Sequence, residues 1–401
     1  MMTLLSIEEP ETKSDSAIWH KQHPVWGLGF RPFYLLAACF SALSLPLWIA
    51  QYLGWFSAWP QVTAAWHMHE MIFGVVIAVI IGFLFTAGRN WTGLPTPTNL
   101  HLAGLACWWL IGRVAMLAAP PSLAALVDLS FLPLAAWPIY RVLKQSGNKR
   151  NMFLIMLLAL LTVANAIFHA AVLNLITLNP ALPIHAAILI VVIIESVIGA
   201  RVIPMFTQNG VPGVIPVAYP WLNRSAITAI VIASLASISP LPSALTASLC
   251  AGAGCTVLAR FALWQPHRTL GTPLVWILHL SYAWIPLGFF MLALSAIGLI
   301  PSSAAWHALT VGSMAGLILG MMTRTTLGHT GRLLKTGHAE LAMYLLIQTG
   351  AVARVTASLG APALYQVSLI VAMLCWSSAF LLFVIAYGPY LLRARVDGRE
   401  G

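Results

Sequence analysis

The sequence Trp66-His67-Met68-His69-Glu70 stands directly before an apolar run over residues 71–88, which is closed by Arg89-Asn90-Trp91-Thr92-Gly93. A run of this length can cross a bilayer as one helix. Histidines and a carboxylate at its head are costly within lipid unless they are paired, hydrated or bound to a metal. The stretch therefore predicts a membrane-spanning helix with a functional polar site at one end.

The whole chain has the composition of a membrane protein. Of its 401 residues, 60% are hydrophobic and 7% are charged, and the mean hydropathy is +0.88. Soluble domains carry about 25% charged residues, so a soluble fold is excluded. The apolar runs do not alternate with polar residues as the strands of a β-barrel do. We therefore predict an all-α, polytopic fold whose main partner is the lipid bilayer.

About twelve transmembrane helices of some twenty residues each are expected. Their approximate limits are residues 30–53, 67–88, 99–118, 122–143, 152–174, 183–206, 225–241, 244–265, 273–298, 303–325, 339–359 and 363–392. They form a single transmembrane domain over 28–392. Residues 1–27 are expected to be a disordered cytoplasmic leader without a cleavable signal peptide, and 393–401 a short basic cytoplasmic tail.

The positive charges fix the expected orientation. Lys and Arg collect in alternate loops and near both termini, which places those loops and both termini in the cytoplasm. The net charge of +10 is explained by this asymmetry, so no nucleic-acid partner is expected. The protein is predicted to be a multi-pass membrane protein.

With this orientation, histidines from four helices fall in the outer third of the membrane: His67 and His69, His169, His185 and His307. Imidazole is a common ligand of haem iron and copper, and helix bundles build metal sites from facing helices. The shared depth of these histidines therefore predicts metal or haem ligation.

Helical spacing limits which of these residues act together. His67 and His69 point about 200° apart on a regular helix, so they are expected to serve different partners. Glu70 lies about 60° from His67 and is expected to orient it. Trp306-His307 begins a second apolar run in the same direction as Trp66-His67. We therefore expect His307 and either His67 or His69 to bind haem.

His169 and His185 are expected to form a second ligand set, for copper or another haem. Glu195 lies near the middle of an expected span, where an ionisable side chain indicates function, and is a candidate proton relay. Arg201 and Arg324, near the cytoplasmic ends of their spans, are candidate supporting residues.

Several motifs resemble one known family. They are Gly29-Phe30-Arg31-Pro32-Phe33, Trp66-His67-Met68-His69-Glu70-Met71, Asn90-Trp91-Thr92-Gly93, Arg201-Val202-Ile203-Pro204-Met205-Phe206, His307-Ala308-Leu309-Thr310-Val311-Gly312 and Leu327-Gly328-His329-Thr330-Gly331-Arg332. In combination they are similar to the NnrS family of bacterial membrane proteins. The resemblance implies an inner-membrane protein with haem and copper, linked to denitrification and to protection against nitric oxide and nitrosative stress.

Two other functions stay open beside this one. A secondary transporter for a metal or small anion fits the span count and the midplane Glu195. A membrane sensor that binds nitric oxide without turnover fits the histidines equally well, so enzymatic activity is left undecided. No Cys-x-x-Cys-His occurs, so any haem is expected to be non-covalent haem b. Electrons, if used, would come from a quinol or a redox partner.

Overall fold

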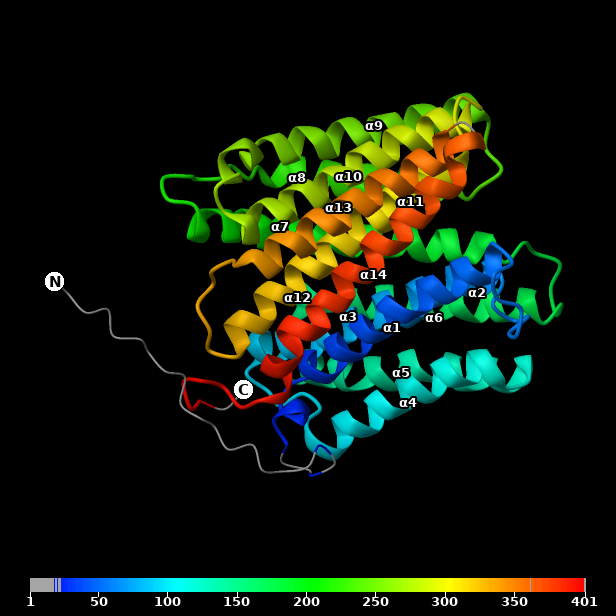
Figure 1. Cartoon of the computed structure of the whole chain (residues 1–401). Coiled ribbons are helices and arrows are strands. Elements are labelled where there is room, and N and C mark those ends of the chain that lie inside the picture. Colours follow the sequence, from blue (N-terminus) through cyan, green and yellow to red (C-terminus); the bar gives the residue numbers. More distant parts are fainter. Residues whose placement is uncertain (1–17, 19, 21–22, 361, 400–401) are drawn as a thin grey trace.

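The computed structural model describes residues 18, 20, 23–360 and 362–399, and the regular structure within them is helical (Figure 1). Its long helices are α1 (Phe30–Tyr52), α3 (Ile77–Thr92), α4 (Asn99–Ala118), α5 (Pro121–Gln145), α6 (Phe153–Val172), α7 (Ala181–Gly210), α8 (Pro220–Ser237), α9 (Ser243–Ala262), α10 (Pro273–Ala296), α12 (Gly316–His329), α13 (His338–Leu359) and α14 (Pro362–Leu392).

Two of these helices continue shorter segments. The helix α2 (Ala64–His69) and the π-helix η2 (Glu70–Val76) lead directly into α3. In the same way α11 (Ser302–His307) and the π-helix η5 (Ala308–Ala315) lead into α12. Each composite helix therefore has an abrupt change of helical pitch immediately after a histidine, a feature that often marks functional sites.

The predicted all-helical membrane fold is confirmed. Each of the twelve expected spans falls on a long helix or on one of the two composite helices. Ten of these stretches are long and apolar enough to cross a membrane, and α8 and α13 are the two that are not among them. The more polar α13 carries Glu340, Gln348 and Arg354. The number of spans and their orientation stay predictions.

The two composite helices lie near the centre of the bundle, with α4 and α5 at one edge and α8 and α9 at the opposite edge (Figure 1). They are the most buried of the ten candidate spans, with 83% of the apolar window buried for Ala64–Thr92 and 72% for Ser302–His329. Polar side chains on these helices are therefore shielded from lipid by neighbouring helices.

The described ends of the chain are joined at one end of the bundle. The Arg31 guanidinium, fully buried, donates hydrogen bonds to the carbonyl oxygens of Leu391 (3.0 Å) and Arg393 (2.7 Å). Most of the predicted leader lies outside the described residues. Its last part forms the 3-10 helix η1 (Pro24–Trp26), which packs against α14. Both ends thus meet on one side, as an even number of spans requires.

Candidate functional site

A buried polar cluster lies where α2, α4 and α5 meet. His69 Nδ1 is 3.0 Å from Glu70 Oε1, and His69 Nε2 is 3.1 Å from Asp128 Oδ2. The Arg113 guanidinium donates to the second oxygen of Glu70 (2.6 Å) and also to Asp128. All four residues are buried. Such charges are tolerated away from water because nearly every lone pair has a charge-assisted partner.

Helix α6 completes this cluster. Asp128 Oδ2 also accepts hydrogen bonds from Asn165 Nδ2 (2.7 Å) and His169 Nε2 (3.0 Å). One ligand atom each from His69, Asp128 and His169 lies within 4.8 Å of the others. Two imidazoles and a carboxylate form a donor set suited to copper, zinc or iron.

The charges in the cluster do not balance. The two carboxylates and the single guanidinium sum to −1 when both histidines are neutral. One protonated histidine or one monovalent cation would make the cluster neutral. This arrangement can therefore hold either a proton or a singly charged metal ion.

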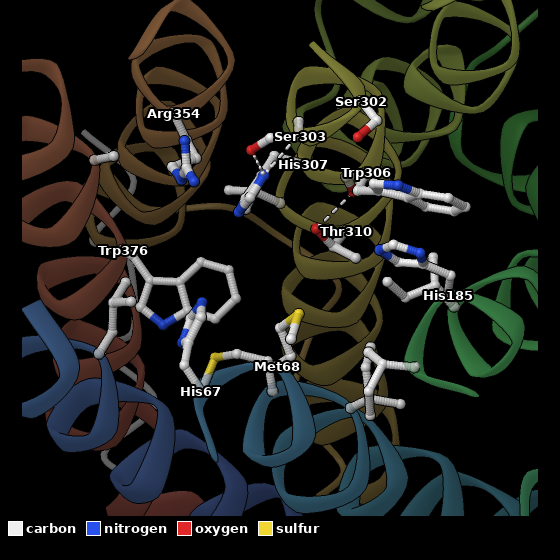
Figure 2. A pocket seen from close by; sticks show the side chains of 17 residues that line it. His67, Met68, His185, Ser302, Ser303, Trp306, His307, Thr310, Arg354 and Trp376 are labelled. Carbon is white, nitrogen blue, oxygen red and sulfur yellow. Dashed lines mark hydrogen bonds between the residues drawn. The ribbon is translucent and has the colours of Figure 1, made fainter. Parts of the chain in front are cut away.

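A separate cavity of about 240 Å³ is lined by other histidines (Figure 2). Among the residues that line it are His67, His185, Trp306, His307 and Arg354. Figure 2 shows His67 and Arg354 towards one side, His185 and Trp306 towards the other, and His307 between them. The structure thus brings together histidines from α2, α7 and α11.

His307 is held in one orientation. Its Nδ1 donates to the carbonyl oxygen of Ser303, one helical turn earlier, at 2.7 Å. The hydrogen on Nδ1 leaves the lone pair on Nε2, the atom that a ligating histidine offers to a metal. A carbonyl behind the ring also fixes the ring plane, as it does for metal-bound histidines.

His67 is held by stacking instead. Its ring lies parallel to the Trp48 ring, with an interplanar angle of 8° and 5.3 Å between centroids. Its buried Nδ1 has no hydrogen-bond partner among the described residues. A buried nitrogen without a partner costs free energy, which a bound ligand would recover. His185 stacks on Trp306 in the same manner, with 4.0 Å between centroids.

The prediction that His67 and His69 face different partners agrees with this geometry, because His67 lines the cavity and His69 belongs to the polar cluster. The prediction that Glu70 orients His67 is wrong, since the Glu70 carboxylate contacts His69 and Arg113. The change to a π-helix at Glu70 breaks the regular angle per residue on which that prediction rested.

The predicted ligand sets are regrouped in the structure. His169 lies with His69 in the polar cluster, whereas His185 lines the cavity with His67 and His307. The expected pair of His169 and His185 is therefore divided between two sites.

Glu195 lies apart from both sites. Its carboxylate accepts a hydrogen bond from Ser313 Oγ in η5 at 3.0 Å. It also lines a second, smaller cavity of about 110 Å³ with mostly aliphatic and aromatic neighbours, among them Phe83 and Met321. A proton-relay role for Glu195 stays a prediction.

The two supporting arginines also have partners elsewhere. Arg201 donates to Asn151 Oδ1 at 2.9 Å. The Arg324 guanidinium carbon lies 3.7 Å from the centre of the Phe206 ring, a cation–π contact. Neither arginine lines the 240 Å³ cavity.

Two arginines that lie at these sites, Arg113 in the polar cluster and Arg354 on the cavity, are absent from the predicted site residues. Arg113 and Arg354 each lie within an expected span, at 99–118 and 339–359, and an ionisable side chain within a span is the signal that identified Glu195 and could have identified them. Both arginines stand within predicted spans and not in the loops whose positive charges indicate orientation. Their depth within helices, rather than their charge, indicates function.

Comparison with known proteins adds one finding. Residues 24–395 match the family described as NnrS protein, which covers nearly the whole chain. A search of the curated proteins gives no match.

Proposed function

Because the chain belongs to the NnrS family, we propose that it is a haem- and copper-containing membrane protein that handles nitric oxide. His67 and His307 are the proposed haem-binding residues. His69 and His169, with Asp128, are the proposed copper ligands. The bacterial inner membrane is the proposed location, with the histidines towards the outer face and both termini in the cytoplasm.

The orphaned Nδ1 of His67 is the observation that carries this proposal. This buried imidazole nitrogen has no partner among the described residues, and it lies on the same cavity as His307, whose Nδ1 is already hydrogen-bonded, so the two imidazoles are the residues that would hold a haem in this cavity. An adjoining cavity of about 240 Å³ is lined by the same two histidines and enlarges the space. The lining includes Leu45 and Ala372, so the residues present suit a flat apolar group.

Haem iron, when bound, supplies a site for a diatomic ligand and for one-electron chemistry. The chain supplies the surroundings. Ser303 orients His307 through its carbonyl oxygen, and Trp48 fixes the plane of His67. Apolar side chains such as Leu45 and Ala372 line much of the cavity.

The polar cluster fits a copper ion by donor type and by charge. Imidazole nitrogen and carboxylate oxygen are both copper ligands. The uncompensated charge of −1 favours a bound cation over a neutral or anionic group. Arg113 binds the carboxylate oxygens that the ion would not use, and thereby holds Glu70 and Asp128 in place.

The test is an optical spectrum with metal analysis of the purified full-length protein from haem-replete cells. Wild type is expected to show a haem Soret band and bound copper. His67→Ala and His307→Ala should lose most of the Soret absorbance and keep copper. His169→Ala should do the reverse, and His267→Ala, an exposed residue in η4 (Pro266–Thr269), is the matched control.

Folded wild-type protein with neither haem nor copper would refute the proposal. Unchanged spectra in both His67→Ala and His307→Ala would remove the proposed haem ligands. Turnover of nitric oxide by the loaded protein separates an enzyme from a sensor. Uptake of a metal or anion into vesicles by cofactor-free protein would favour a transporter instead.

A further inference from the structure

The chain contains two copies of one helical unit. Certain glycines and a threonine follow His69 and His307 at the same distances, namely 5, 13, 23 and 24 residues. These are Gly74, Gly82, Thr92 and Gly93 after His69, and Gly312, Gly320, Thr330 and Gly331 after His307. His69, rather than His67, is therefore the counterpart of His307.

The two copies also match in space. Each begins with a six-residue helix that ends at the histidine and continues as a π-helix. Each composite helix is followed by a left-handed glycine, Gly93 with φ 68° and Gly331 with φ 77°. In the first copy α1 packs on α3 and α4 on α5, and in the second α10 packs on α12 and α13 on α14.

An arginine is common to both copies. Arg113 in α4 and Arg354 in α13 each begin the pattern Arg-Val, six residues, Pro, one residue, Leu, at 113–123 and 354–364. In the first copy, Glu70 links the arginine to the histidine, since it contacts both Arg113 and His69.

Hydroxyl groups provide that link in the second copy. Arg354 Nη1 donates to Ser358 Oγ at 2.7 Å, and this oxygen is 3.1 Å from Ser303 Oγ. The Ser303 carbonyl in turn accepts the hydrogen bond from His307. Arg354 therefore matches Arg113 in the sequence pattern, but its side-chain hydrogen bond within the described part of the chain is to a neutral serine.

The acidic residues of the first copy have no equivalents in the second. Ala308 stands directly after its histidine, where the first copy has Glu70, and Leu369 follows its arginine by 15 residues, as Asp128 does. Leu369 lines the adjoining cavity together with Arg354. No acidic side chain lines either cavity in the described part of the chain. The guanidinium is thus a cation at a largely apolar cavity without a counter-ion.

We propose that the Arg354 guanidinium binds a monoanion with two oxygens on one atom, of the carboxylate type, in the cavity it shares with His67 and His307. The planar fork of a guanidinium matches two such oxygens at once. An inner carboxylate compensates the arginine of the first copy, and an external anion compensates that of the second. The proposal stands on Arg354 and its cavity and requires neither haem nor copper.

The anion has two possible sources with the same chemistry. It is either a free small anion or the carboxylate of a larger group held in the cavity. Calorimetric titration of purified full-length protein with sodium formate, at constant ionic strength against sodium chloride, measures the first. The amount of chromophore retained per chain after purification measures the second.

Variants of Arg354 and Leu369 connect each measurement to the site. Arg354→Gln should weaken formate binding by about 10- to 100-fold, the loss expected for charge-assisted hydrogen bonds. Leu369→Asp should restore the inner carboxylate and abolish formate binding, whereas Leu369→Asn, of the same size but neutral, should keep it. Both Leu369 variants retain Arg354, so the comparison of Leu369→Asp with Leu369→Asn tests the proposal even if Arg354→Gln does not fold.

A free anion is supported if formate binds wild type saturably, binds Leu369→Asn similarly, binds Arg354→Gln more weakly and does not bind Leu369→Asp. Absence of formate binding to wild type, with chromophore retention at least about tenfold lower in Arg354→Gln and Leu369→Asp than in Leu369→Asn, supports a bound carboxylate. The proposal is overturned if Arg354→Gln changes neither measurement, or if Leu369→Asp behaves like Leu369→Asn in both.

Discussion

Replacing Asp128 by asparagine is expected to destabilise the protein by about 3–5 kcal/mol, the usual cost of breaking a buried ion pair. One carboxylate oxygen is 2.7–3.1 Å from polar atoms of His69, Asn165 and His169, and the other accepts from Arg113. The side chain is 2% exposed, so water cannot replace these partners. Asparagine has nearly the same volume, and the loss is therefore electrostatic rather than steric.

A double-mutant cycle of Asp128→Asn with Arg113→Gln measures the interaction free energy between these two side chains. Each single variant leaves a buried charge without one of its partners, whereas the double variant removes both charges together. The double variant should therefore lose less free energy of unfolding than the two single variants lose in sum, by an interaction free energy of about 2–3 kcal/mol. Unfolding in mixed micelles, followed by tryptophan fluorescence, gives the free energies. Arg141→Gln, at an exposed position, is the control and should stay within about 0.5 kcal/mol of wild type.

A cost below about 1 kcal/mol for Asp128→Asn would refute the ion-pair argument. Strict additivity in the cycle would do the same, because two residues that interact directly cannot be independent. Loss of copper without loss of stability would instead show that Asp128 is a ligand whose network contributes little to folding.

Three other perturbations follow from local geometry. Gly82→Ala should cost about 1–3 kcal/mol, because the new Cβ would meet a phenylalanine Cβ of α1 at 2.9 Å, whereas Gly104→Ala, with open space around it, should be neutral or stabilising in the same unfolding assay. Glu195→Gln should leave stability within about 1 kcal/mol of wild type, since the amide oxygen can keep the serine hydrogen bond, and a loss of several kcal/mol in the same assay would contradict this. Arg395 holds the pKa of Asp397 below its usual value of 3.8. Their ion pair therefore helps to hold the C-terminal tail in place above pH 3.8, and this stabilisation is lost progressively as the pH falls below 3.8. Amide hydrogen exchange of the tail, corrected for intrinsic rates, should rise at low pH in wild type and be already raised at neutral pH in Asp397→Asn.

The expected helices agree with the structure because hydropathy is a local property. An apolar run of about twenty residues has few alternatives to a helix in lipid, where the backbone must satisfy its own hydrogen bonds. The sequence predicts about twelve spans, and α8 and α13 are the two expected spans that are not apolar enough to be among the ten candidates. Their polar residues lower the mean hydropathy without changing the helical form. Arg354 illustrates the point, since the residue that weakens α13 as a span is the one that gives the cavity its charge.

The candidate histidines could be identified from sequence, but their grouping could not. Depth along a helix follows from residue number, so histidines at one level can be recognised. Lateral position depends on which helices are neighbours, and this is decided by the packing of the whole bundle. Shared depth predicts one ligand set for His169 and His185, yet α7 places His185 on the cavity with His67 and His307.

Composition, apolar length and angular spacing are enough to predict a helical membrane protein in which His67 and His69 face different partners, because each is set by residues close together in the chain. Membership of the NnrS family rests instead on its motifs and on the family match over residues 24–395. Tertiary packing is what brings Glu70 to His69 and Arg113 to two carboxylates, and it leaves Arg354 without an acidic partner among the described residues. These contacts join helices distant in sequence, so they exist only once the helices have packed.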